Sequence, residues 1–131
     1  MKKLFFGILF ATLFTINLNG QQRTYKMKII AKKNCVFSLQ RNIVGIQASA
    51  ILTVLQFNRK FPNENIKEIK KILNSLAISS KYPSIRVKAQ LASMVLNYPL
   101  LFANIKLDSM NRDLTFQKIS KLINIRLLSS L

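Results

Sequence analysis

The sequence predicts a folded, all-α protein. Two observations indicate helices, and a third indicates that the chain folds. Apolar residues recur at helical spacing along most of the chain, and no segment alternates apolar and polar residues as a half-buried strand does. Hydrophobic residues make up 50% of the 131 residues, far more than a disordered basic tail contains. We therefore expect a small helical bundle, or a short stack of antiparallel helix pairs, after an N-terminal signal peptide.

Residues 1–20 have the order of a secretory signal peptide. Two lysines form a positive n-region, an apolar h-region follows, and the small residue Gly20 precedes polar residues. We expect cleavage after Gly20 and export, either to a periplasm or as a secreted protein. The alternative is an uncleaved signal that anchors the chain in a membrane, because Leu18 is an imperfect residue at the third position before the cut.

Two further segments follow the signal peptide. Residues 21–41 mix basic and apolar residues in a pattern that fits neither the helical nor the strand period well. They are expected to form a basic N-terminal arm or a first helix, and residues 42–131 are expected to form the helical domain. Cys35 is the single cysteine, so no intramolecular disulfide forms. We expect its side chain to be buried, and the alternative is a disulfide with another chain.

The helical domain is expected to contain at least four helices. Apolar spacing and turn residues give the first three ranges as 42–57, 63–78 and 84–98. Pro99 either ends the third helix or opens another one. The apolar face of the last helix consists of Phe116, Ile119, Ile123 and Leu127. The expected N-caps are Asn42, Asn63, Ser84 and Asp113.

The helices at 42–57 and 84–98 are similar when shifted by 41 residues, which is close to the period of stacked helix-pair repeats. Residues 83–92 resemble the start of the inner helix of a HEAT-type repeat, in which alanines follow an aliphatic–Arg pair. The matching residues are Ile85, Arg86, Ala89 and Ala92. The family's usual acidic residue is absent, and Gly45 occupies the position equivalent to Arg86. The resemblance covers about one and a half repeats, residues 42–98. It implies a concave interaction surface.

The chain is strongly basic, with 21 Lys and Arg against 4 Asp and Glu and a formal net charge of +17. Such a surface attracts polyanions. We expect a non-enzymatic interaction or scaffold module whose partner is an acidic protein, an anionic lipid or a glycan. Nucleic acid is disfavoured, because export separates the chain from genomic DNA and because no aromatic residues are interleaved with the basic ones as stacking platforms.

The composition argues against catalysis and against a bound metal or cofactor. The sequence has no histidine and one cysteine, which excludes a His-based triad and the usual zinc ligand sets. Glu64 and Glu68 lie four residues apart among lysines, as on a solvated helix face. Asp108 and Asp113 are the remaining carboxylates, and no glycine-rich phosphate loop is present. We therefore expect no enzymatic activity.

Five basic residues form the candidate site for an anionic partner. Three lie on the polar face of helix 63–78 and two on the polar face of the next helix, so antiparallel packing places them along one rim. The candidate rim consists of Lys67, Lys70, Lys71, Arg86 and Lys88.

The alternative function is that of a small integral-membrane or membrane-active cationic helical protein. Residues 42–58 and 89–105 are each uncharged for 17 positions, the lower limit for a membrane span. Polar residues such as Gln47 and Asn97 interrupt both runs, and both runs also suit helices buried in protein.

The exported chain is predicted to begin near Gln21. Intact-mass analysis of exported material is expected to show the loss of residues 1–20, because signal peptidase cuts after a small residue that follows the h-region. Retention of Met1 in a membrane pellet would instead identify an uncleaved anchor.

Overall fold

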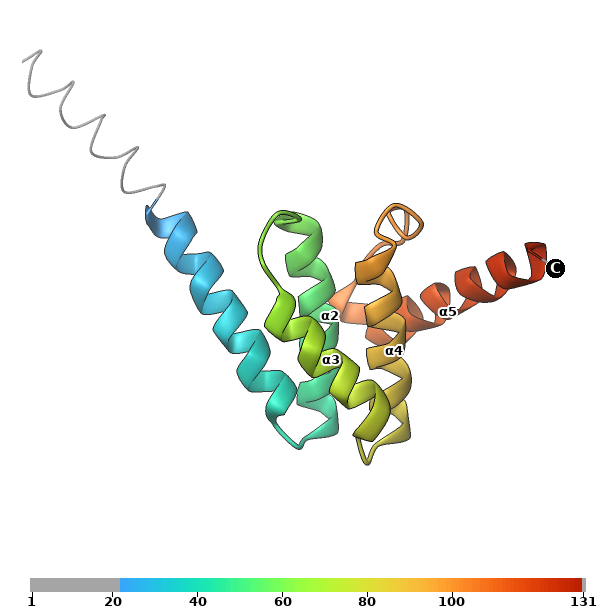
Figure 1. The fold of residues 1–131 in the computed structure, drawn as a ribbon, viewed down its shortest axis with the longest axis horizontal. Coiled ribbons are helices and arrows are strands. Elements are labelled where there is room, and N and C mark those ends of the chain that lie inside the picture. Colours follow the sequence, from blue (N-terminus) through green and yellow to red (C-terminus); the bar gives the residue numbers. More distant parts are fainter. Residues whose placement is uncertain (1–21, 131) are drawn as a thin grey trace, which may run out of the picture. The chain divides into compact units, whose positions relative to one another are not determined.

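The computed structural model describes residues 22–130, and this part of the chain is helical without any β-strand. The labelled elements are α2 (Val44–Lys60), α3 (Lys67–Ser79), α4 (Pro83–Asn97), the 3₁₀ turn η1 (Ser109–Asn111) and α5 (Arg112–Ser129) (Figure 1). Residues 22–40 are helical as well. The expected all-α class is confirmed. The proposed signal peptide at residues 1–20 lies outside the described residues.

The chain divides into two compact units, Met1–Lys33 and Asn34–Leu131. In the first unit, residues 22–33 are helical, and the side chains of Tyr25, Met27 and Ile30 are exposed. The second unit begins at Asn34, ahead of the expected start of the helical domain at residue 42. It contains α2 to α5 and the candidate site.

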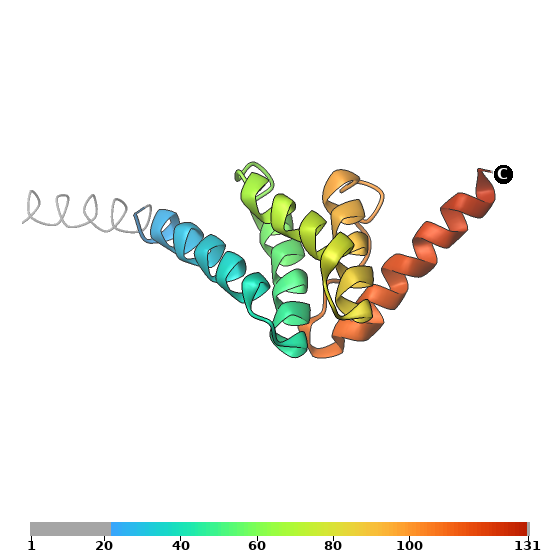
Figure 2. The same cartoon turned by 60° about the horizontal axis from the view of Figure 1, so that its bottom comes forward.

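Helix α2 is the central helix of the second unit. Eight of its 17 residues are buried, and they lie on several sides of the helix, as its apolar sequence predicts. In Figures 1 and 2, α2 and α4 run alongside each other and α3 packs against α4. The most deeply buried side chains include Ile51 and Val54 of α2, Leu73 of α3, and Ile85 of α4. These three helices therefore form most of the bundle core, and Leu39, Phe102 and Ile119 from neighbouring elements are buried just as deeply.

The end of the helix at residues 22–40 is joined to α2 by a buried hydrogen bond. Gln47 Nε2 donates to the carbonyl oxygen of Leu39 at 3.0 Å. Carbonyls in the last turn of a helix lack partners within the helix, so the Gln47 side chain supplies one of them with a donor. Cys35 and Leu39 are buried with it, at 3% and 0% exposure. The expected burial of Cys35 is confirmed.

The predicted N-caps of the first two helices are wrong. Helix α2 begins after Ile43 and α3 after Ile66, and neither helix has a side-chain cap at that position. Ahead of α3, the Oδ1 atom of Asn65 accepts the backbone N–H of Lys67 at 3.0 Å. This turn delays the start of α3 beyond Asn63, because the side chain satisfies an N–H group that begins the helix.

The predicted caps of the last two helices are wrong as well. Helix α4 begins after Tyr82, so Ser84 lies inside the helix rather than at its cap; Pro83 is the first helical residue, where a missing N–H costs nothing. Helix α4 ends at Asn97, and turns without an α-helix follow Pro99. Asp108 caps η1 by accepting the Met110 N–H at 2.9 Å. Helix α5 then begins after Asn111, with Asp113 in its first turn.

The 41-residue shift also relates buried positions of α2 and α4. Each equivalent pair consists of two residues that are no more than 7% exposed. These pairs are Ala48 with Ala89, Val54 with Val95, and Leu55 with Leu96. Small and branched side chains at matching positions let the two helices approach closely along the same face.

The apolar face predicted for α5 is buried only in its first half. Phe116 and Ile119 are 4% and 0% exposed, whereas Leu127 is 60% exposed. The predicted apolar face is therefore packed against other elements only at its N-terminal end. In Figure 2 this half of α5 runs away from α4, so the second unit leaves it uncovered.

Replacing Ala89 by leucine is predicted to destabilise the bundle. Ala89 has 0% exposure at the packed face of α4, and a larger side chain there overpacks the contact at a cost of about 1–3 kcal/mol. Chemical denaturation measures the change. Val87→Leu is the matched control, because Val87 is 53% exposed on the same helix. Equal stability of the two variants would contradict the burial of Ala89.

Candidate functional site

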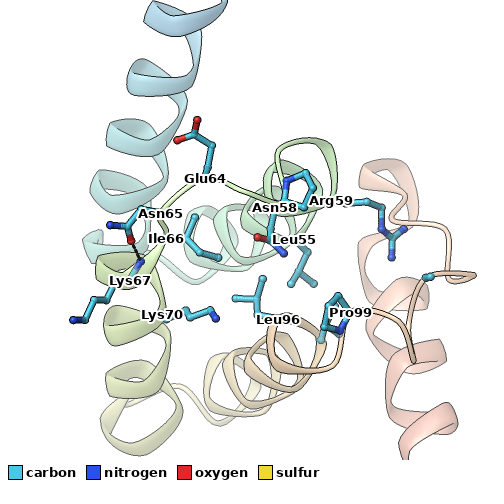
Figure 3. Close-up of a pocket in the computed structure, with 13 residues that line it drawn as sticks. Leu55, Asn58, Arg59, Glu64, Asn65, Ile66, Lys67, Lys70, Leu96 and Pro99 are labelled. Carbon is cyan, nitrogen blue, oxygen red and sulfur yellow. Dashed lines mark hydrogen bonds between the residues drawn. The ribbon is translucent and has the colours of Figure 1, made fainter.

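A groove of about 570 Å³ lies between the C-terminal half of α2, the start of α3 and the end of α4 (Figure 3). Each of these elements and the connections beside them contribute lining residues. The residues that line it are Leu55, Asn58, Arg59, Pro62, Glu64, Asn65, Ile66, Lys67, Lys70, Val95, Leu96, Pro99 and Ala103. All of them belong to the second unit.

The floor of the groove is apolar. Leu55 and Ile66 contribute side chains that are 2% and 6% exposed, and Val95 and Leu96 are equally well buried. In Figure 3, Leu55, Ile66 and Leu96 extend toward the same central space. These side chains are fixed by core packing, so the floor is preformed.

The charged side chains around this floor are mostly basic. Arg59, Lys67 and Lys70 line the groove together with one carboxylate, Glu64. Figure 3 shows Lys70 extending toward Leu96 at the centre, whereas Lys67 and Glu64 extend away from it. Within residues 22–130, no carboxylate forms an ion pair with the Lys70 ammonium group. The groove therefore offers a half-buried positive charge directly beside an apolar surface.

Arg59 has a structural role at one end of the groove. Its Nη2 atom donates to the Phe102 carbonyl at 3.0 Å, and its Nη1 atom donates to the Ile105 carbonyl. Desolvation by burial lowers the pKa of Arg59 below its usual value. Gln56 supports the same segment by donating to the Leu107 carbonyl at 3.0 Å. Helix α2 therefore holds the segment that follows α4.

Two asparagines supply the neutral polar groups of the groove. Asn65 uses its Oδ1 atom for the backbone of Lys67, which leaves the amide N–H₂ group as a donor. Asn58 extends from α2 toward the groove in Figure 3. The arrangement can accept an anionic group beside apolar surface, because it offers one ammonium group and amide donors.

The predicted rim is only partly brought together. Lys67 and Lys70 line the groove, and Lys71 is exposed on α3 outside the lining. Arg86 lies elsewhere, since its Nη1 atom donates to the Ser80 carbonyl at 2.6 Å. That hydrogen bond ties α4 to the turn that follows α3.

Lys88 lies at a second groove, of about 440 Å³, between α4 and α5. Its ammonium nitrogen is 3.3 Å from a carboxylate oxygen of Asp113. The same nitrogen is 5.9 Å from the centre of the Phe116 ring, within the range of a cation–π contact. Lys88 therefore connects α4 to α5 and does not share a groove with the lysines of α3.

Arg59 and Asn58 were missed by reasoning from the sequence. The sequence does show that Arg59 lies in the last turn of an apolar helix, where a positive charge is favoured. This position does not predict that Arg59 binds backbone carbonyls more than forty residues away in the sequence. Asn58 follows the apolar run of α2, and nothing in the pattern distinguishes it from a solvated residue.

No cluster of three His, Cys, Asp or Glu residues suited to a metal ion occurs within residues 22–130. The thiol of Cys35 lies in the core, and burial raises its pKa. A buried thiol with a raised pKa carries little thiolate, the form that reacts as a nucleophile.

Comparison with protein families, curated proteins and solved structures yields no match. None of the helices described between residues 22 and 130 is long and apolar enough to cross a membrane. The fold and the groove together define the class: an α-helical bundle with a basic, partly apolar groove.

Replacing Arg59 by glutamine is predicted to loosen the segment after α4. The change removes a charged donor from two backbone carbonyls, at a cost of about 0.5–1.5 kcal/mol, because Arg59 is exposed and water replaces part of the lost hydrogen bonding. Hydrogen exchange of residues 100–107 is expected to accelerate, and the denaturation midpoint to fall. Lys60→Gln removes the same charge from the neighbouring position and is expected to change neither property. Similar effects of the two changes would show that charge, rather than these bonds, is responsible.

Proposed function

We propose that this chain is a non-enzymatic interaction module that binds an anionic partner through the α3 basic surface, defined as Lys67, Lys70 and Lys71. The observation that carries the proposal is the cluster of three lysines on one helix, of which Lys67 and Lys71 are exposed and Lys70 is half-buried. The net charge of +17 supplies a long-range attraction for the same class of partner.

The spacing of the three lysines supports a single binding surface. Residues three and four apart lie on the same face of a helix, so Lys67, Lys70 and Lys71 are neighbours on α3. Arg86 and Lys88 already serve intramolecular contacts, and they contribute less to the proposed surface.

Export and repeat architecture form part of the proposal. The n-region and h-region at residues 1–20 support an exported protein whose partner is extracellular or periplasmic. The matching burial of Ala48 with Ala89 supports a HEAT-like relation between α2–α3 and α4–α5. In that arrangement a concave face, rather than an active site, contacts the partner.

Membrane association is the second candidate function, and a separate observation favours it. Residues 22–33 contain five basic residues and no acidic one, and Tyr25, Met27 and Ile30 are exposed along this helix. Basic helices with exposed apolar side chains bind the surface of anionic membranes. In this case the first unit, rather than α3, is the contact.

Binding to a sulfated polysaccharide such as heparin tests the main proposal. We expect saturable binding that weakens steeply with salt, because the Debye length is only about 10 Å at 0.1 M. The triple variant Lys67→Gln, Lys70→Gln and Lys71→Gln is expected to lose at least tenfold in affinity. The matched control changes three exposed lysines elsewhere, Lys106, Lys118 and Lys121, and has the same net charge. It is expected to lose less than threefold.

Two results would contradict the proposed surface. Equal losses in the two triple variants would show that binding follows net charge alone. Loss of binding on deletion of residues 21–33, with the α3 triple variant unaffected, would assign the contact to the first unit.

A further inference from the structure

We propose that the groove between α2, α3 and α4 binds a free fatty acid, with the alkyl chain on the apolar floor and the carboxylate at Lys70. The inference rests on the proposed function in one respect, since Lys70 belongs to both sites. It otherwise depends on the groove itself, which the polyanion proposal does not need.

The size of the groove favours a small ligand. Its volume of about 570 Å³ lies within the range of about 300–1,000 Å³ that is typical of small-molecule sites. The floor consists of side chains already fixed in the core, including Leu55 and Leu96 at 2% and 6% exposure. The exposed lining residues Pro62, Pro99 and Ala103 add apolar surface that a flexible alkyl chain can contact without rearrangement of the bundle.

The arrangement of charge favours a single anionic head group. Only Lys70 among the labelled cations extends toward the centre of the groove, whereas Arg59 reaches the Phe102 and Ile105 carbonyls (Figure 3). Lys67 extends outward. A polyanion requires a row of cations facing it, and the interior of the groove offers one.

The neighbouring polar groups suit a carboxylate. The Lys70 ammonium group has no ion-pair partner among the described residues, and a carboxylate oxygen at this position forms a charge-assisted hydrogen bond. The amide group of Asn58 extends toward the same space and adds a donor. A ligand with one carboxylate and an unbranched alkyl chain satisfies both the polar and the apolar parts of the groove.

Calorimetric titration of the purified full-length chain with hexanoate, octanoate and decanoate tests this inference. We expect one site, with affinity rising by about fourfold for each added methylene until the floor is covered. Lys70→Met is expected to weaken decanoate binding at least tenfold and to change 1-decanol binding less than twofold. Lys71→Met removes the same charge from the adjacent position outside the groove, and it is expected to leave decanoate binding within twofold of the original.

A groove-filling variant separates this inference from the proposed function. Ala103 lines the groove and is exposed, so Ala103→Phe is expected to occupy the space without disturbing the core. It is expected to weaken both decanoate and 1-decanol at least tenfold, with thermal unfolding and heparin binding unchanged.

Absence of saturable decanoate binding, or equal losses in Lys70→Met and Lys71→Met, would overturn the fatty-acid site. Heparin binding that persists under those conditions would leave the proposed function standing. Loss of binding to phosphatidylglycerol vesicles in Ala103→Phe, with decanoate unaffected, would assign the groove to membrane lipid and also overturn the inference. Decanoate binding without any heparin binding would refute the proposed function alone.

Discussion

The burial of α2 on several sides is the constraint on which the rest of the second unit depends. Ala48 and Ala50 on α2, with Ala89 and Ala92 on α4, provide small side chains at packed positions. Close approach of helices lets the larger core residues interdigitate with few voids. Because α2 is held in this way, its C-terminal turn presents Arg59 to the segment after α4, and the groove acquires a fixed floor.

The shortage of carboxylates shapes how this basic chain uses its cations. Three arginines donate to backbone carbonyls: Arg59 to Phe102 and Ile105, Arg86 to Ser80, and Arg112 to Gly45. The guanidinium fork can satisfy more than one acceptor and is less strongly hydrated than an ammonium group, so it suits this bridging role. These three arginines therefore stabilise contacts between helices and connecting segments, while most of the described lysines are exposed.

The candidate site combines features that usually oppose one another. An apolar floor favours an apolar ligand group that leaves water, whereas an ammonium group favours an anion, which is costly to remove from water. Lys70 brings the two features together, because its half-buried side chain extends toward Leu96 at the centre of the groove. An amphipathic ligand with both characters therefore matches the groove better than a purely ionic or purely apolar one.

Helical periodicity in the sequence alone determined the all-α class and the approximate ranges of α2, α3 and α4. The burial of Cys35 was also expected from the sequence. The periodicity failed at the helix starts, where Asn65 rather than Asn63 accepts a backbone N–H. It also could not show that Leu127 is exposed, because an apolar face does not reveal whether another element covers it. Only the tertiary structure divided the five candidate basic residues, bringing Lys67 and Lys70 to the groove and pairing Lys88 with Asp113. The physical reason is that periodicity reports the face of a helix on which a residue lies, whereas a site depends on which helices meet at that face.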